Sequence, residues 1–333
     1  MENIELQKNK KIVLSVDPIL KEYEDILLKK SKKYFKSVDF ILGSEPETNS
    51  YYFKKLKKLK ENMIFGKVIE KIYNHKKTNY YEELLKKYLE IDYVLVIGEI
   101  GYSETFIDLV KKKNSKIKFI KFIWDKMGKK EIEWYKKTYD EVYTFEKEDA
   151  KTYDIKWRPS FYLEHEVEGK EEDFYYLGRE RDTERYKYVK KIYEYCLKNN
   201  LKYNILLYTQ DKKKKDKFIT NQKIKYSENI KNVKKSKVTF EKNIVDQKGL
   251  SLRTLECLAY NTKLITTNKD VINYDFYNEN NILIVDKIEE IEKIDINFFK
   301  SPYLELSKEI LDKYSFEGFL KEIFFIRIGE RDE

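Results

Sequence analysis

Cysteine, glycine, proline and histidine are scarce in this chain, and each scarcity excludes a class of protein. The 333 residues include two Cys, ten Gly, four Pro and two His. Two cysteines without CxxC spacing, Cys196 and Cys257, exclude a disulfide scaffold, and so little Gly and Pro excludes a collagen-like or low-complexity chain. No apolar run approaches the ~18 residues of a membrane-spanning helix. The polar start, MENIELQKNKK, lacks an apolar signal core, so we expect a cytoplasmic protein.

Apolar and aromatic residues are plentiful by contrast. They make up 41% and 15% of the chain, respectively, which excludes simple disorder because disordered chains lack aromatic and β-branched side chains. A single hydrophobic core stops growing near roughly 250–300 residues. A chain of 333 residues therefore predicts two domains.

The charge balance is basic. Lys and Arg number 68 against 59 Asp and Glu, which gives a net charge of +9. Such a surplus suggests an anionic partner, namely nucleic acid, anionic lipid or a phosphorylated substrate. The alternative is an AT-rich genome, whose codons favour Lys, Ile, Asn and Tyr. Arg binds phosphate in a bidentate way that Lys does not, so the few arginines carry more information, and three of them gather at 179, 181 and 185.

Short apolar runs alternate with helical patterns along the chain. The runs that indicate strands are 11–16, 38–42, 92–97, 116–124, 141–145, 173–177, 203–208, 237–240, 263–267 and 281–285. Helical spacing is found at 19–37, 51–74, 78–90, 183–200, 251–260 and the last ~25 residues, and another helix begins near Ser103. This alternation predicts an α/β protein with parallel sheets.

The pattern breaks at residues 155–172, where a Pro, a Gly and mixed charge are typical of an interdomain linker. We therefore expect an N-terminal domain at 1–158 and a second domain at 159–310. The remaining residues, 311–333, form a C-terminal helix that we expect to pack back on the N-terminal domain.

A first candidate binding stretch covers residues 173–185. An apolar strand stops at Gly178, and Arg179 follows at once, with Arg181 two residues later. Ligands of open α/β sheets gather outside the carboxyl ends of strands, a Gly there allows close approach, and an Arg can grip phosphate oxygens. The alternative is that these arginines pair with Glu180, Asp182 and Glu184 on a solvated surface.

A second candidate stretch covers residues 246–268. Gly249 and Ser251 suit a turn and a helix N-cap, and the helix N-terminus is an anion site. Arg253 and Glu256 lie at i, i+3 on one side of the helix. The alternative is that these two side chains form an internal ion pair on an ordinary amphipathic helix.

These stretches resemble a family. GLSLRTLECLAYNTKLITTN is similar to the donor-side element of GT-B glycosyltransferases, and most of all to CgeB-like and lipopolysaccharide or capsule biosynthesis enzymes. Their G-x-x-x-R-x-x-E pattern is matched by Gly249, Arg253 and Glu256, followed by KLITTN and YDFY. FIWD at 122–125 and RPSFY at 158–162 also resemble the group, so the similarity covers roughly residues 90–290.

The resemblance implies two Rossmann-like domains that face each other across a cleft, with an acceptor-side domain at 1–158 and a nucleotide-sugar domain at 159–310. It implies metal-independent transfer of a sugar from a nucleotide-sugar donor to a glycan or lipid-linked glycan acceptor, with no cofactor. Arg179 and Arg253 would stabilise the leaving diphosphate, and Glu256 would bind ribose or sugar hydroxyls. The residues that we expect at the donor are Gly178, Arg179, Arg181, Gly249, Ser251, Arg253, Thr254 and Glu256.

A base that activates the acceptor hydroxyl would come from the first domain. Three acidic residues follow predicted strands there, namely Asp17, Glu99 and Asp125. The alternative for each is a carboxylate that caps a helix or binds loop amides.

Other interpretations remain open. Lys-rich segments at 27–36 and 51–60 could contact the anionic inner face of the cytoplasmic membrane, or could be ordinary solvated helices. A nucleic-acid-binding protein is a second hypothesis, although no RRM, KH or helix-turn-helix pattern is found and we expect no nucleic acid. Lys248 stands where many retaining GT-B enzymes carry an acid, so a catalytically inactive GT-B-like partner subunit is a third.

Overall fold

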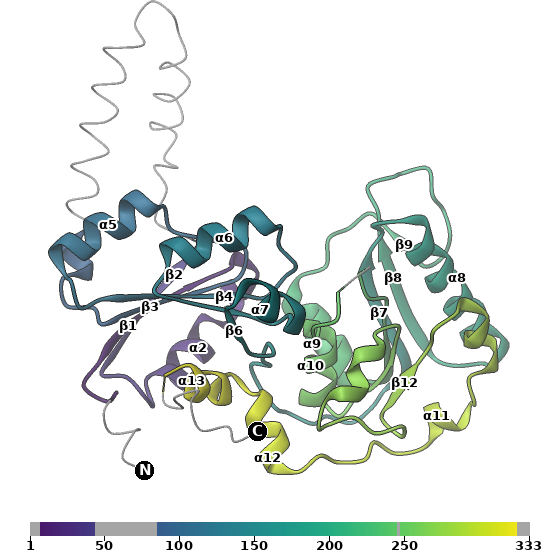
Figure 1. Cartoon of the computed structure of the whole chain (residues 1–333). Helices are drawn as coiled ribbons and strands as arrows, with labels where there is room; N and C mark the ends of the chain where they lie inside the picture. Colours follow the sequence, from purple (N-terminus) through teal and green to yellow (C-terminus); the bar gives the residue numbers. More distant parts are fainter. Residues whose placement is uncertain (1–6, 44–84, 245–246, 325–333) are drawn as a thin grey trace, which may run out of the picture. The chain divides into compact units, whose positions relative to one another are not determined.

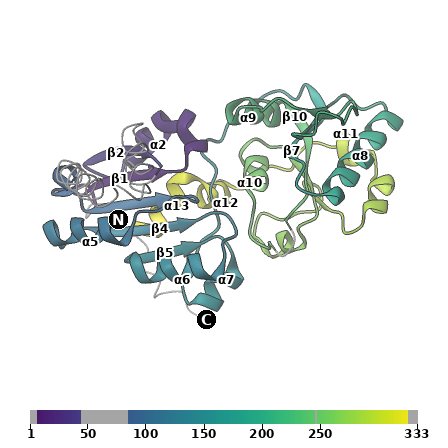
Figure 2. The ribbon, with the colours of Figure 1, turned by 90° about the horizontal axis from the view of Figure 1, so that it is seen from above.

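The computed structural model describes residues 7–43, 85–244 and 247–324. The chain divides into two compact units, Met1–Trp157 (unit 1) and Arg158–Glu333 (unit 2). In the described residues each unit is an α/β domain built on a parallel six-stranded sheet, as two Rossmann-like domains require. The strands and the helices that cover them can be followed in Figure 1 and, from above, in Figure 2.

The sheet of unit 1 has the strand order β2-β1-β3-β4-β5-β6. Its strands are β1 Lys11–Val16, β2 Ser37–Leu42, β3 Tyr93–Ile97, β4 Lys118–Ile123, β5 Glu141–Thr144 and β6 Lys156–Trp157. The central strands are almost continuously apolar and fully buried, because helices cover both faces of a parallel sheet. The order reverses between β1 and β3, which makes the carboxyl ends of these two strands the switch point of this sheet.

The helices of unit 1 lie on both faces of the sheet. They are η1 Pro18–Tyr23, α2 Glu24–Ser31, α5 Glu104–Lys113, α6 Lys129–Thr138 and α7 Lys147–Tyr153. Figure 1 shows α5 and α6 on one face and α2 on the other. Ser103 begins α5 by accepting a hydrogen bond from the amide of Phe106. Phe106, Val110 and Ile132 then pack with the strands in one core.

The sheet of unit 2 has the strand order β12-β11-β10-β7-β8-β9. Its strands are β7 Glu172–Arg179, β8 Tyr203–Tyr208, β9 Ile219–Thr220, β10 Ser236–Glu241, β11 Lys263–Thr266 and β12 Ile282–Ile284. Counted from β7 as the first strand, this is the order of the doubly wound dinucleotide-binding fold, 3-2-1-4-5-6, read from the opposite edge. The chain changes direction between β7 and β10, so the switch point lies at their carboxyl ends.

The helical elements of unit 2 are α8 Thr183–Lys198, α9 Tyr226–Lys235, α10 Leu252–Ala259, η2 Lys269–Asn273, η3 Ile288–Lys293, α11 Asn297–Lys300, α12 Lys308–Tyr314 and α13 Phe316–Phe324. Helix α8 covers one face of the sheet, and α9 and α10 cover the other (Figure 1). Asn261, which follows the C-cap residue Tyr260 of α10, adopts the left-handed conformation with φ of 49°, as expected just after a helix end.

Residues 158–163, within the predicted interdomain linker, form a buried segment. The Arg158 guanidinium is fully buried, donates hydrogen bonds to the carbonyls of Pro159, Ser160 and Lys313, and pairs with Glu322. Tyr162 pairs with Ser315 through a β-bridge, and the Phe161 ring packs on Phe319 at 4.5 Å. The stretch predicted as an interdomain linker, 155–172, contains the boundary between the two units, and its residues 158–163 pack against α12 and α13.

Most predicted strands are confirmed within one or two residues. Helices α6, α7 and α9 were not predicted, because their apolar faces are short and Lys-rich. The strand predicted to stop at Gly178 continues through Arg179. The helix predicted at 51–74 and most of the one at 78–90 lie outside the described residues, as does the basic segment at 51–60.

Candidate anion-binding site of unit 2

A pocket of about 330 Å³ lies at the carboxyl ends of β7 and β8. It is lined by Leu177, Gly178, Arg179, Tyr208, Gln210, Lys223 and Ile224. Two of these side chains are cations, Arg179 and Lys223, and none is a carboxylate. Within the part of the chain that the structure describes, neither cation forms an ion pair. The pocket therefore offers two positive charges to a ligand at the edge where such sheets bind their ligands.

The carboxylates beside Arg179 have other partners. Glu180 pairs with Lys214, and Asp182 caps α8 by accepting a hydrogen bond of 2.6 Å from the amide of Arg185. Arg179 and Arg181 are both exposed. Among the described residues, therefore, neither arginine pairs with a neighbouring carboxylate, and the surface ion pairs of the alternative interpretation are not found for these two. The predicted binding roles of Arg179 and Arg181 stay predictions.

Packing against Tyr176 explains why residue 178 is a glycine. A Cβ atom placed on it would lie 2.1 Å from the hydroxyl oxygen and 2.6 Å from Cζ of Tyr176, and the Tyr176 side chain is buried. No real Cβ contact is that short, so only glycine fits here without displacing the tyrosine. The glycine at the lip of the pocket thus makes room for Tyr176, independently of any ligand.

We expect Gly178→Ala to destabilise unit 2 by about 1–3 kcal/mol, the usual cost of an overpacked core. Chemical denaturation of the full chain measures the change. The double variant Tyr176→Phe/Gly178→Ala removes the nearest clashing atom and should recover part of the loss. A single variant as stable as the wild type would show that Tyr176 moves aside at no cost.

Helix α10 is tied to the end of β7 by Arg253. Its Nη1 lies 3.3 Å from the Glu256 carboxylate, and its Nη2 donates hydrogen bonds to the Asn229 side chain (3.0 Å) and the Leu177 carbonyl (3.3 Å). The side chains of Arg253 and Glu256 are only 13% and 6% exposed. The internal ion pair of the alternative interpretation is thus present. Because Leu177 also lines the pocket, Arg253 connects α10 to the pocket wall.

The other residues of the second stretch also have structural partners. Ser251 caps α10 by accepting a hydrogen bond of 3.3 Å from the amide of Thr254. The Thr254 hydroxyl is buried and donates to Glu241 at 2.9 Å. The Gly249 carbonyl accepts a hydrogen bond from the Asn268 side chain. Contact of these residues with a donor stays a prediction.

Sequence reasoning missed Lys223 and Glu241 at the carboxyl edge of this sheet, and it named Arg185 only as a member of the arginine cluster. Lys223 lies between β9 and α9 and lines the pocket. Arg185, in the first turn of α8, donates a hydrogen bond of 2.9 Å to the carbonyl of Lys242, which follows β10. Glu241 ends β10 with one carboxylate oxygen buried and without a hydrogen-bond partner among the described residues. The position of Glu241 at a strand end was the signal that could have found it.

The carboxyl edge of unit 1 brings the three predicted bases onto adjacent strands. Asp17 follows β1, Glu99 lies two residues after β3, and Asp125 lies two residues after β4. Gly98 has a φ of 108°, and a Cβ on it would lie 2.7 Å from Asp17 Cβ and 3.2 Å from the Trp124 ring. Only glycine allows this close approach.

Two of these carboxylates already bind local amides. Asp17 accepts a hydrogen bond of 3.0 Å from the amide of Ile19, and Asp125 accepts one of 2.8 Å from the amide of Lys126. These are the capping and loop contacts of the alternative interpretation. Each carboxylate keeps a second oxygen, so the predicted role as base stays a prediction.

Lys121 is a buried ammonium beneath the loop that carries Glu99. Its Nζ donates to the carbonyls of Gly98 and Ile100 and lies 4.6 Å from the centre of the Tyr135 ring. Burial lowers the pKa of Lys121 to about 7, while the charges of Asp17 and Glu99 act to raise it. The loop after β3 is therefore held by hydrogen bonds from a lysine whose charge depends on pH near neutrality.

This lysine predicts a pH dependence of stability. In the unfolded chain its pKa is near 10.5, whereas in the folded chain it is about 7. Between these values the unfolded state binds more protons, so the free energy of unfolding should rise with pH from about 7 towards about 10. Chemical denaturation of the full chain and of Lys121→Met at several pH values measures the free energy of unfolding of each. The difference between these two free energies should change across that pH range. Free energies that change with pH in parallel would contradict the prediction.

No protein-family model matches this chain. No curated protein has a sequence that matches it significantly either. The α/β fold of each unit and the geometry of the two sheet edges therefore carry the functional argument.

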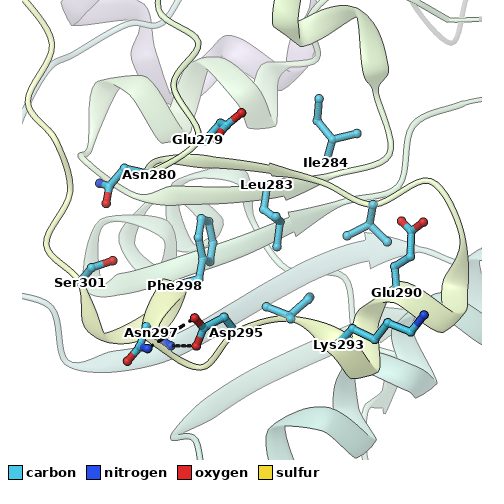
Figure 3. Close-up of a pocket in the computed structure, with 12 residues that line it drawn as sticks. Glu279, Asn280, Leu283, Ile284, Glu290, Lys293, Asp295, Asn297, Phe298 and Ser301 are labelled. Carbon is cyan, nitrogen blue, oxygen red and sulfur yellow. Dashed lines mark hydrogen bonds between the residues drawn. The ribbon is translucent and has the colours of Figure 1, made fainter.

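A larger pocket of about 460 Å³ lies along the edge strand β12 (Figure 3). Leu283, Ile294 and Phe298 line its apolar part. Two of its carboxylates serve local turns, since Glu290 accepts a hydrogen bond from the amide of Asp286 and Asp295 accepts one from the amide of Asn297. This pocket lies at the edge of the sheet, away from the switch point, so we favour the smaller pocket as the functional site.

Two further observations concern the described residues as a whole. Residues 7–43, 85–244 and 247–324 contain no cluster of three or more His, Cys, Asp or Glu side chains that could hold a metal ion. Over the same ranges, no helix has the length and apolar character needed to span a bilayer.

Proposed function

We propose that this protein is a glycosyltransferase that transfers a sugar from a nucleotide-sugar donor to a cell-surface glycan, such as lipopolysaccharide or capsule. The observation that carries the proposal is the pocket at the ends of β7 and β8, in which Arg179 and Lys223 are free of carboxylate partners among the described residues. Two adjacent cations at the carboxyl edge of a doubly wound sheet favour a diphosphate ligand.

Sugar transfer of this kind requires groups that stabilise the negative charge of the leaving diphosphate rather than a nucleophile from the protein. When the anomeric bond breaks, the electron pair stays on the diphosphate, and the sugar passes through an oxocarbenium-like state. Arg179 and Lys223 would stabilise the diphosphate as it leaves, which is a charge that grows in the transition state. Tyr208 offers a ring against which the base or sugar can pack.

Arg253 and Glu256 take a supporting role in this proposal. Their ion pair and the hydrogen bond from Arg253 to the Leu177 carbonyl fix α10 against β7. They would therefore hold the pocket wall in place instead of gripping the donor directly. Glu256 remains a candidate for binding donor hydroxyls.

Unit 1 would supply the acceptor side. The proposal is a GT-B arrangement in which the two units close on one donor and one acceptor. Asp17, Glu99 and Asp125 are the candidates for the base that takes the proton of the acceptor hydroxyl. Lys121 would hold the Glu99 loop in position. A cytoplasmic location, with contact at the inner face of the membrane where lipid-linked acceptors lie, fits this role.

A donor screen tests the proposal. Isothermal titration calorimetry of the full chain against UDP, GDP, ADP, CDP and CMP should give heat for at least one nucleotide. The corresponding nucleotide sugars should then be hydrolysed slowly without an acceptor. No heat from any nucleotide would overturn the proposal, and binding without any turnover would favour the inactive partner subunit instead.

A further inference from the structure

The segments that border the β7–β8 pocket carry a surplus of positive charge. Residues 179–182 and 210–225 together hold nine Lys or Arg against four Asp or Glu, a surplus of five out of the net +9 of all 333 residues. Other segments, such as 27–36 with five Lys and no acidic residue, carry an equal surplus, so the relevant feature of this one is its place beside a pocket that is lined by two cations.

The β8–β9 loop, Gln210–Lys217, supplies most of these charges. Lys212, Lys213, Lys215 and Lys217 are exposed, and none forms an ion pair within the described ranges of the chain. The two acidic residues of the loop have other partners: Asp211 accepts a hydrogen bond from the amide of Lys213, and Asp216 accepts one from the Tyr186 hydroxyl. The loop therefore leaves its ammonium groups to solvent.

Two contacts fix this loop at the pocket. It begins at Gln210, which lines the pocket. Lys214 pairs with Glu180, the residue after Arg179, and also lies 5.0 Å from the centre of the Tyr186 ring. Lys214 thus ties the loop to the residue that follows Arg179. The loop connects β8 with its neighbour β9 (Figure 1).

We propose that the β8–β9 loop collects multiply charged phosphate ligands and guides them into the pocket of Arg179 and Lys223. This inference rests on the proposed anion site and adds a mechanism by which the ligand associates with it. A surface of one sign beside a pocket raises association rates by roughly 10–10³-fold at low ionic strength. Salt screens such a field over about 8 Å at physiological strength, so the effect is on association rather than on the contacts of the bound ligand.

The test reverses three charges of the loop. Inorganic pyrophosphate is the probe, and its association and dissociation rates with the full chain are obtained from ³¹P NMR line shapes at NaCl concentrations from low to high. Lys212→Glu/Lys213→Glu/Lys215→Glu should lower the association rate about 10-fold at low salt. The dissociation rate should stay within about twofold, and the difference should vanish at high salt.

The matched control reverses three exposed lysines at other places in unit 2. Lys198 ends α8 at the amino edge of the sheet, and Lys293 and Lys300 lie by β12, at the opposite edge from β9. Lys198→Glu/Lys293→Glu/Lys300→Glu changes the net charge equally and should leave the association rate near that of the wild type. If the loop variant and this control behave alike, the proposal is overturned.

The outcomes separate this inference from the enzyme proposal. If the loop speeds pyrophosphate binding but no nucleotide sugar is turned over, the role of the loop is supported and the glycosyltransferase proposal is wrong. If a nucleotide sugar is turned over and the loop variant does not change its turnover, the glycosyltransferase proposal is supported and the role of the loop is wrong. If the loop variant loses binding to single-stranded DNA while its pyrophosphate rates are unchanged, the loop serves a nucleic acid, and the inference is wrong.

Discussion

Arg179→Ala is expected to weaken the binding of a nucleoside diphosphate about 10- to 150-fold. A hydrogen bond to a charged group contributes about 1.5–3 kcal/mol, and the guanidinium lines the pocket without a carboxylate partner in the described chain. Since no ion pair among residues 7–43, 85–244 and 247–324 is lost, the fold should keep its stability. Calorimetric titration of the full-length variant measures the affinity, and a thermal melt measures the stability.

The chain offers a control for this prediction two residues away. Arg181 is exposed like Arg179 but does not line the pocket. Arg181→Ala removes an equal charge two residues further along the chain and should cost less than about threefold, as expected for an exposed charge that makes no direct contact with the ligand. Arg179→Lys should recover only part of the affinity, because an ammonium cannot bind a phosphate in a bidentate way. Equal losses for Arg179→Ala and Arg181→Ala would indicate a diffuse charge effect and argue against a specific contact.

Arg158→Ala is expected to lower the stability of unit 2 by about 3–5 kcal/mol, the usual effect of removing one partner of a buried ion pair. The guanidinium is fully buried, its Nε lies 3.0 Å from the Glu322 carboxylate, and it donates to three backbone carbonyls. The substitution removes the cation 3.0 Å from this buried carboxylate and leaves those carbonyls without the guanidinium donor. Chemical denaturation of the full chain measures the loss.

A second substitution separates the causes of this loss. Glu322→Gln in the Arg158→Ala background removes the buried negative charge that Arg158 no longer balances and should recover part of the stability, whereas the lost carbonyl contacts cannot be recovered. If Arg158→Ala does not unfold at lower denaturant than the wild type, the guanidinium contributes nothing to stability, and the buried segment at 158–163 is held by its aromatic side chains alone.

The sheet strands could be predicted from the sequence because local pattern determines them. Apolar runs such as 11–16 and 203–208 match β1 and β8 in full. The end of β7 could not be predicted from local pattern. Gly178 is a turn signal when read locally, yet the strand continues because Gly178 and Arg179 pair with Leu207 and Tyr208 of β8. Long-range pairing overrides local propensity here.

The candidate site shows the same limit. Helical spacing placed Arg253 and Glu256 together, but it could not decide between a ligand contact and an ion pair. The deciding partners are the Asn229 side chain and the Leu177 carbonyl, 24 and 76 residues away in sequence. Lys223 was missed because no motif surrounds it, and it reaches the pocket only through the fold.

The most direct measurement is a crystal structure of the full chain grown with whichever nucleoside diphosphate gives heat in the titration. We expect its phosphate groups in the pocket at the ends of β7 and β8, within hydrogen-bond distance of Arg179 and Lys223. A nucleotide bound only in the pocket along β12, or with its phosphates turned away from both Arg179 and Lys223, would contradict the proposed site.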